Sequence, residues 1–277
     1  MSEPIIKVEN LWYQYPESNF WALRGINLEI RRGELIALIG QNGGGKSTLA
    51  KNLNGLYKPT KGRVLVEGMD TKEVPTQEIV KRVGYVFQNP SHQIFESKVY
   101  DEVAYGPKNF GLSEDEIAER VEWALSLVGL QGYEDVHPYD LDYGKMKLLT
   151  VASVLAMKPD VLVLDEPTTG QDHRGRWILA DLSKKLNREG FTIVTITHDM
   201  RYVAEVAKRT ILIANGQIVM DGPTRKVLTA LDILHKAAIK PPQVVQLAHA
   251  LREKGIDAGD PLTVREALEE FKRLFKK

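Results

Sequence analysis

Apolar residues follow two different periods along this chain, and the change of period marks its regions. The first part carries short β-branched or apolar runs, broken by turns such as Arg32-Gly33 and Glu67-Gly68, a pattern typical of strands. Continuous apolar runs return after residue 157, as expected of strands buried on both faces of a parallel sheet. The predicted strands are Ile5–Val8, Ile26–Ile30, Leu35–Ile39, Arg63–Val66, Val161–Leu164, Thr192–Ile196, and Thr210–Ile213 with Gln217–Met220 around the hairpin-like Asn215-Gly216.

Between the two groups of strands, from about residue 90 to residue 157, the pattern becomes helical. Glu114–Val128 places apolar residues three and four positions apart with charges between them. After Asp221-Gly222-Pro223 the chain is predicted to be helical to its end, with one helix starting at Pro241-Pro242 and another at about Thr263–Phe275. The apolar faces of these last two helices are Val244, Val245, Ala248 and Leu251, then Val264, Leu268, Phe271 and Leu274.

Composition narrows the class of protein. The 277 residues include 37 basic and 37 acidic side chains, so no net charge favours a nucleic-acid partner. The absence of cysteine excludes disulfides, thiolate metal sites and cysteine nucleophiles. The first residues do not have the pattern of a signal peptide, and no apolar run approaches the roughly 20 residues of a spanning helix. Any membrane role is therefore expected to be peripheral.

The strongest chemical signal is Gly40-Gln41-Asn42-Gly43-Gly44-Gly45-Lys46-Ser47, which fits the phosphate-binding P-loop pattern G-x-x-x-x-G-K-[ST]. It follows a predicted buried strand and precedes a helix through Leu49, Ala50 and Leu53. This order directs backbone N–H groups and a helix N-terminus at one polyphosphate. Lys46 is expected to reach the β- and γ-phosphates, and the Ser47 hydroxyl to ligate Mg²⁺. A glycine-rich turn alone would not explain Lys-Ser at this spacing.

Two further elements follow buried strands. Asp165 and Glu166 end the Val161–Leu164 run, at the carboxyl edge where open α/β sheets bind ligands. We expect Asp165 to hold Mg²⁺ and Glu166 to polarise the water that attacks the γ-phosphate. His198 ends the next strand, where a neutral imidazole can donate to phosphate.

In order and spacing these motifs resemble those of the ATP-binding cassette (ABC) ATPases, over nearly all residues through about 225. The resemblance implies an α/β P-loop cassette: a mixed sheet, an inserted helical arm at about 90–157, and a separate helical tail, giving domains 1–225 and 226–277. In that family an aromatic residue stacks on adenine. Tyr15 matches its place, although Tyr13, Trp12 or a purely structural role for the aromatic remain open.

The resemblance also assigns roles to individual positions. Gln88 matches the Q-loop glutamine that contacts Mg²⁺ and the attacking water, Asp172 matches an aspartate that reaches across a dimer, and His198 matches the switch histidine. The expected ligands are ATP and Mg²⁺. Catalytic roles are expected for Glu166, His198 and Gln88; metal ligation for Ser47, Gln88 and Asp165; and nucleotide binding for Tyr15, Gly40, Asn42, Gly43, Gly44, Gly45, Lys46, Ser47, Thr48, Asp142, Gly144 and Asp172.

One segment departs from the family pattern. The family signature Leu-Ser-Gly-Gly-Gln reads Leu141-Asp142-Tyr143-Gly144-Lys145 in this sequence. In the family this segment presses on the γ-phosphate held by the other subunit. Unless Asp142 is protonated or turned away, its carboxylate would repel that phosphate. Asp142 is also a good helix N-cap, and both readings can hold together.

The segments Gln88–Phe95 and Val99–Pro107 resemble the ATPases of energy-coupling factor (ECF) transporters, which import vitamins and transition-metal ions. This resemblance implies a second ABC ATPase subunit, a transmembrane coupling subunit, a substrate-capture membrane protein, no nucleic-acid partner, and a peripheral location on the cytoplasmic face of the cell membrane. Ile94 and Phe95 are expected to be apolar anchors for the membrane partner. The cargo cannot be read from this chain.

Several alternatives stay open from the sequence. The apolar tail helices can dock on the main domain or, as in the ECF family, pair with the partner's tail, which we favour. The dimer can be a homodimer or a heterodimer, and we favour a heterodimer whose partner carries an intact signature. The alternative function is a soluble ABC ATPase of DNA repair or translation, but the long coiled-coil insertion or second fused cassette expected there is missing. A P-loop kinase would lack the signature region and the switch histidine.

Overall fold

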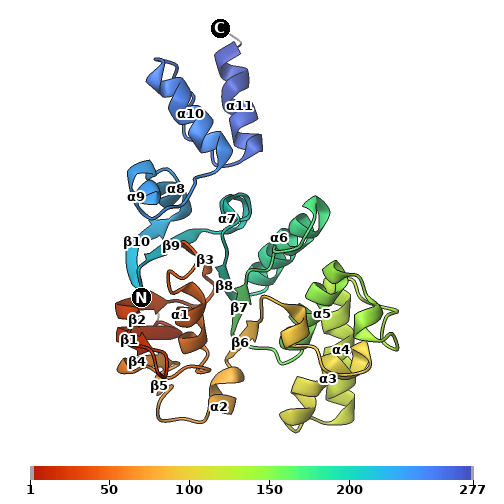
Figure 1. Cartoon of the computed structure of the whole chain (residues 1–277). Helices are drawn as coiled ribbons and strands as arrows, with labels where there is room; N and C mark the ends of the chain where they lie inside the picture. The colour runs from red at the N-terminus through yellow and green to blue at the C-terminus, as the bar shows by residue number, and fades with distance from the viewer. Residues whose placement is uncertain (1–2, 276–277) are drawn as a thin grey trace.

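The computed structural model describes residues 3–275, which form a two-sheet body, a helical arm and a helical tail (Figure 1). Six strands make a mixed sheet through the centre of the body, parallel except where β10 pairs with β9. In spatial order they are β10 (Gln217–Pro223), β9 (Arg209–Ala214), β3 (Leu35–Ile39), β8 (Thr192–Ile196), β7 (Val161–Asp165) and β6 (Val83–Val86). The predicted mixed sheet is confirmed, and all residues of β3, β7 and β8 are buried, as their apolar runs predict.

The N-terminal strands belong to a second, antiparallel sheet that the pattern does not separate from the first. Its order is β2 (Trp21–Ile30), β1 (Ile6–Gln14), β4 (Lys61–Val66) and β5 (Met69–Asp70). β1 is longer than predicted because its pairing continues past an irregularity at Asn10, which has a φ of 45°. A polar residue at a bulge interrupts the alternation of a strand without ending it.

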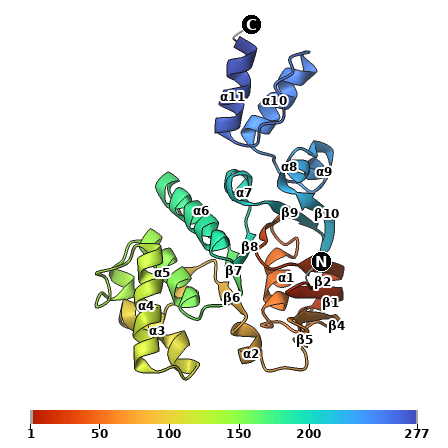
Figure 2. The same cartoon turned by 180° about the vertical axis from the view of Figure 1, so that it is seen from behind.

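Helices cover the sheets in two places. α1 (Lys46–Leu53) packs between the two sheets, whereas α3 (Val99–Asn109), α4 (Glu114–Val128) and α5 (Tyr143–Leu155) form the arm beside β6 and β7 (Figures 1 and 2). Each group has its own buried apolar cluster. α6 (His173–Arg188), with 16 residues, follows β7. The short helices are α2 (Thr76–Val80), η1 (Pro90–His92), η2 (Pro138–Asp140), α7 (Met200–Val206), α8 (Thr224–Leu228) and α9 (Leu231–Lys236). Within residues 3–275 no helix combines the length and the apolar character needed to span a bilayer.

The tail consists of α10 (Gln243–Glu253) and α11 (Val264–Phe275), which stand side by side at the far end of the molecule (Figures 1 and 2). Its base docks on the cassette, since Val245 and Leu262 are buried in one cluster with residues of β3 and α7. The outer surface is different: Leu247 is 47% exposed, Leu268 54% and Val264 74%. The tail therefore docks through its base and leaves a second apolar face without cover from the described residues.

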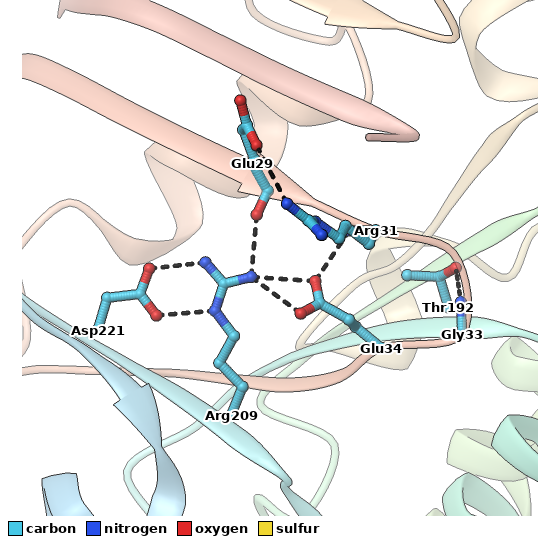
Figure 3. Close-up of polar contacts among 7 residues, drawn as sticks. All are labelled: Glu29, Arg31, Gly33, Glu34, Thr192, Arg209 and Asp221. Carbon is cyan, nitrogen blue, oxygen red and sulfur yellow. Dashed lines mark hydrogen bonds and ion pairs between the residues drawn. The ribbon is translucent and has the colours of Figure 1, made fainter. Parts of the chain in front are cut away.

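The two sheets are joined at the amino edge of the six-stranded sheet by Arg209 (Figure 3). Its guanidinium donates two hydrogen bonds to the Asp221 carboxylate, at 2.7 and 2.6 Å, and others to both oxygens of Glu34 at 3.0 Å. It also donates to the Glu29 carbonyl in β2 at 2.9 Å. One side chain thus connects β9, β10, the start of β3 and the antiparallel sheet, and the hydrogen bond to Asp221 is the largest cause of its raised pKa.

Candidate nucleotide site

The P-loop is held in a tight turn between β3 and α1. Gly40 leaves β3 with a φ of 155°, and a Cβ there would lie 2.1 Å from the carbonyl oxygen of Ile213. Gly45 precedes α1 with a φ of 105°, a left-handed conformation that favours glycine. The helix makes its first internal hydrogen bond from Leu49 N to Gly45 O, at 2.8 Å. The amides before it, at Lys46, Ser47 and Thr48, are therefore directed at the position expected for phosphates.

Lys46 is the first residue of α1, directly after the loop, and is only 6% exposed. Its ammonium donates to the carbonyl oxygens of Gly40 and Gln41, at 2.9 and 3.1 Å, and no carboxylate among the described residues pairs with it. Burial lowers the pKa of Lys46, and the negative charges of Glu166 and Asp165 partly oppose this. A buried ammonium that contacts only neutral acceptors is poised to gain from an anion.

Asp165 ends β7 at the carboxyl edge, as predicted. Its Oδ1 accepts a hydrogen bond from the Ser47 hydroxyl at 3.2 Å, and its Oδ2 accepts one from the Tyr85 hydroxyl at 2.5 Å. Residues 3–275 hold no cluster of three or more His, Cys, Asp or Glu that could form an all-protein metal cage. A hydroxyl and a single carboxylate fit Mg²⁺, which is commonly held by one or two carboxylates together with phosphates and water.

Glu166 and His198 meet at the ends of adjacent strands. Glu166 is 6% exposed and has a φ of 47°, an uncommon conformation for a residue other than glycine. His198 follows β8, and its Nδ1 lies 2.9 Å from Glu166 Oε2. The imidazole side chain is 64% exposed, so one face of it is open to a ligand. The structure thus brings the expected water-polarising carboxylate and the expected phosphate donor into direct contact.

The three aromatic candidates for adenine stacking lie in different environments. Tyr15 is 40% exposed, and its hydroxyl is hydrogen-bonded to that of Thr48 in α1, 2.7 Å away. Tyr13 is buried and stacked on Tyr57, with ring centroids 5.0 Å apart, and Trp12 packs edge-on against Trp21. Of the three, Tyr15 is the one that combines an exposed ring with contact to the P-loop helix. Its stacking role stays a prediction.

Gln88 lies on the exposed loop between β6 and η1, where Lys147 of α5 holds its backbone. The Lys147 ammonium donates to the carbonyls of Phe87 and Gln88, and burial lowers its pKa to about 8. The expectation that Ile94 is a partner anchor is wrong, because Ile94 is 4% exposed and belongs to the arm's core. Phe95, 60% exposed and edge-on to Tyr105, is available at this surface.

The altered signature lies apart from the P-loop, at the start of α5. Asp142 caps this helix by accepting a hydrogen bond from Lys145 N at 2.9 Å, so the capping interpretation holds. Its carboxylate also pairs with the Lys145 ammonium at 2.6 Å, and this hydrogen bond is the largest cause of its lowered pKa. Asp142 is therefore charged at neutral pH rather than protonated, and its side chain is turned towards Lys145.

Asp172 lies beside the signature and caps α6, with its Oδ1 accepting from Gly175 N at 2.7 Å. Asp142, Gly144 and Asp172 line one hollow of about 780 Å³. The P-loop group and the signature group pack in separate clusters, since α1 and α5 belong to different apolar cores. One chain therefore has two separate candidate binding surfaces, the P-loop edge and the signature hollow, which we call half-sites.

Sequence reasoning missed two residues that touch the site. Tyr85 contacts Asp165, and Lys147 contacts the Q-loop backbone. A signal was present for the second, since Lys147 interrupts an otherwise apolar stretch of α5 and is 0% exposed. A buried lysine needs hydrogen-bond partners, and these are here the carbonyls of the loop.

Comparison with known proteins agrees with this geometry. The ABC transporter family model matches residues 23–169. The chain is 40% identical over 279 residues to the energy-coupling factor transporter ATP-binding protein EcfA2 of Clostridium tetani, covering 98% of this chain and 97% of that protein. Two longer ABC transporter ATP-binding proteins also match 89% and 95% of this chain, which spans 43% of the length of each.

Solved structures show the same fold. The structure of cbiO1 from Clostridium perfringens, described as part of the ABC transporter complex cbiONQ, superposes with a TM-score of 0.77 and 35% identity over 90% of this chain and all of that one. The dimeric ATP-binding cassette MJ0796 bound to ADP and Pi gives a TM-score of 0.71 and 28% identity, over 79% of this chain and 98% of that one. The chain therefore belongs to the ABC transporter family, as an ATPase cassette resembling those of energy-coupling factor transporters.

Proposed function

We propose that this chain binds and hydrolyses ATP to energise an ECF-type importer of vitamins or transition-metal ions. The observation that carries the proposal is the meeting of four groups at one sheet edge: Ser47 with Asp165, and Glu166 with His198. Similarity to EcfA2 over nearly the whole chain supports the transporter class.

Each side chain at this edge has a distinct task in the proposed hydrolysis. Lys46 exchanges its loop carbonyls for the β- and γ-phosphate oxygens, which are better acceptors for an ammonium. Ser47 and Asp165 would hold Mg²⁺, which supplies neutralisation of the phosphate charge. Glu166 accepts a hydrogen bond from the attacking water and orients it in line with the γ-phosphate. His198 leaves Glu166 and donates to the γ-phosphate.

The two half-sites favour a head-to-tail dimer. A nucleotide on one chain's P-loop would be covered by the partner's signature segment and Asp172. The similar cassette MJ0796 is described as dimeric and bound to ADP and Pi, which supports a dimer as the working form. In a heterodimer with an intact partner signature, this chain's Glu166 and His198 would complete the competent site, and Asp142 would face the partner's nucleotide. We therefore favour the heterodimer, with the exposed tail face, Leu268 and Val264, packed against the partner's tail.

The membrane partners would meet the arm near the Q-loop. Phe95 and Tyr105 form an exposed aromatic pair with ring centroids 4.5 Å apart. Exposed aromatic side chains of this kind are frequent anchors at interfaces. The chain would then act at the cytoplasmic face of the membrane, bound to a transmembrane coupling subunit, while a separate membrane protein captures the cargo.

The test is purification of the tagged chain from membranes, followed by site-directed cross-linking from Phe95. We expect an integral-membrane subunit to co-purify, ATP hydrolysis by the complex, and cross-links from position 95 into that subunit. A matched probe at Arg265, whose side chain is 90% exposed on the tail helix α11, should give none. Purification with a soluble DNA-repair or ribosomal complex, or cross-links from position 265 only, would contradict the transporter assignment.

A further inference from the structure

Tyr85 and Asp165 come from neighbouring parallel strands and lie on one face of the sheet. Tyr85 on β6 is in register with Val163 on β7, and side chains two residues apart on a strand share a face. The tyrosine therefore extends along β7 towards Asp165, where its hydroxyl donates to Oδ2 at 2.5 Å. The other oxygen, Oδ1, is left towards the Ser47 hydroxyl, 3.2 Å away.

This hydrogen bond is sheltered from water. Tyr85 is 6% exposed and Asp165 is 5% exposed, and the ring packs against Phe87 with centroids 5.0 Å apart. The phenol is the donor of this pair, and a hydrogen bond from it to a buried carboxylate is of the strong, charge-assisted kind.

The two oxygens of Asp165 consequently have different roles. We propose that Tyr85 is a positioning residue which holds Oδ2 of Asp165, so that Oδ1 stays beside Ser47 and ligates Mg²⁺ directly or through water. The inference rests on the proposed ATP function and adds to it a residue outside the expected site. Loss of a partner that orients a metal ligand typically lowers metal affinity or activity by about 10–100-fold.

A packing role alone makes a different prediction from a positioning role. Tyr85→Phe keeps the ring, its volume and the contact with Phe87, and removes only the hydroxyl. A residue that merely fills the core would then change stability without changing the dependence on Mg²⁺. A positioning residue would change the Mg²⁺ requirement, because the freed carboxylate can rotate and lose its single orientation.

The experiment is a Mg²⁺ titration of the binding of a fluorescent ATP analogue to the full chain, with binding in EDTA as reference. We expect Tyr85→Phe to need about 10–100-fold more Mg²⁺ for half-maximal enhancement of binding. Binding in EDTA should be unchanged. The control is Tyr202→Phe, another buried tyrosine whose hydroxyl bonds that of Ser183 at 2.8 Å, away from Asp165. It should keep the wild-type Mg²⁺ midpoint.

Two failures can be told apart. If the wild-type chain binds the ATP analogue neither with Mg²⁺ nor without it, the proposed function itself fails. If the wild type shows a Mg²⁺ dependence that Asp165→Asn removes, but Tyr85→Phe leaves the midpoint unchanged, only the role of Tyr85 is overturned. An equal shift in Tyr85→Phe and Tyr202→Phe would also overturn it, because the effect would then follow from lost core stability.

Discussion

The amino and carboxyl edges of the six-stranded sheet both carry charged side chains. Only at the amino edge does a buried or partly buried cation have carboxylate partners within the described residues. At the amino edge, Arg209 bonds two carboxylates and a carbonyl. At the carboxyl edge, Lys46 is more deeply buried and contacts only carbonyls. Two buried side-chain atoms beyond the end of β7, Thr169 Oγ1 and Gln171 Nε2, have no hydrogen-bond partner among the described residues.

The difference separates groups that hold the fold from groups reserved for a ligand. A complete network such as that of Arg209 stabilises the protein only while every partner is present. An incomplete site costs stability in the free protein and recovers it when a ligand supplies the missing partners. The comparison therefore predicts that substitutions at the two edges separate stability from function.

The largest expected effect is at the carboxyl edge. Glu166→Gln keeps the size of the side chain but removes the carboxylate that would orient the attacking water. We expect ATP turnover to fall by about 10²–10⁴-fold while ATP binding is retained. Turnover is measured by phosphate release and binding by a fluorescent analogue. Lys46→Ala is the companion variant and should weaken both. Parental turnover in Glu166→Gln would exclude Glu166 from this role.

The next effect compares the two cations directly. Arg209→Met leaves Asp221 and Glu34 without their shared partner, so the free energy of unfolding should fall by about 2–4 kcal/mol. Lys46→Met removes a poorly compensated buried charge, so stability should be unchanged or higher while ATP affinity is lost. Urea unfolding measures the free energy of unfolding of both variants, and binding of the fluorescent analogue measures their ATP affinity. Arg265→Met, at a side chain 90% exposed, is the control and should change stability by less than about 0.5 kcal/mol. Equal destabilisation by Arg209→Met and Lys46→Met would break the comparison.

The sequence predicted one of these edges and not the other. The P-loop, Asp165-Glu166 and His198 are visible because each follows a continuous apolar run, so parallel strands had to bring them to one edge. Arg209 could not be predicted, since Glu34 and Asp221 meet only through the pairing of β9 with β3 and β10, and the Glu29 carbonyl comes from the other sheet. The burial of Ile94 was missed for a similar reason: the arm core to which it belongs includes residues distant in sequence, such as Leu149 and Leu155.

A smaller effect concerns pH and the buried Lys147. Burial lowers its pKa from 10.5 to about 8 in the folded protein. Below pH 8 the ammonium is charged in both states, and the folded state bears the cost of burying it. Between about pH 8 and 10.5 the folded protein has released a proton that the unfolded chain keeps, so this cost disappears as the pH rises.

We predict that the difference in the free energy of unfolding between the wild type and Lys147→Met changes with pH. From pH 7 to pH 10 the wild type should gain about 2–3 kcal/mol relative to the variant. Urea unfolding of both proteins at the two pH values measures this, and other titrating groups cancel in the difference. Parallel pH curves for the two proteins would show that Lys147 does not titrate in this window.

The last prediction concerns the signature hollow, where Asp142 would lie near the other subunit's nucleotide in the proposed dimer. Asp142 stays ionised beside Lys145, so in a homodimer both composite sites would contain this carboxylate. Asp142→Ser with Tyr143→Gly restores the family pattern at two positions, and serine remains a good N-cap for α5. We expect ATP turnover by the isolated chain to rise about 5–10-fold, equivalent to roughly 1 kcal/mol of charge repulsion removed. Asp135→Ser removes an exposed carboxylate from the same arm and should leave turnover unchanged.

The unaltered chain should hydrolyse ATP slowly alone and faster when mixed with a paralogous cassette that has an intact signature. Fast, cooperative hydrolysis by the unmixed wild-type chain would contradict both the inhibitory role of Asp142 and the preference for a heterodimer.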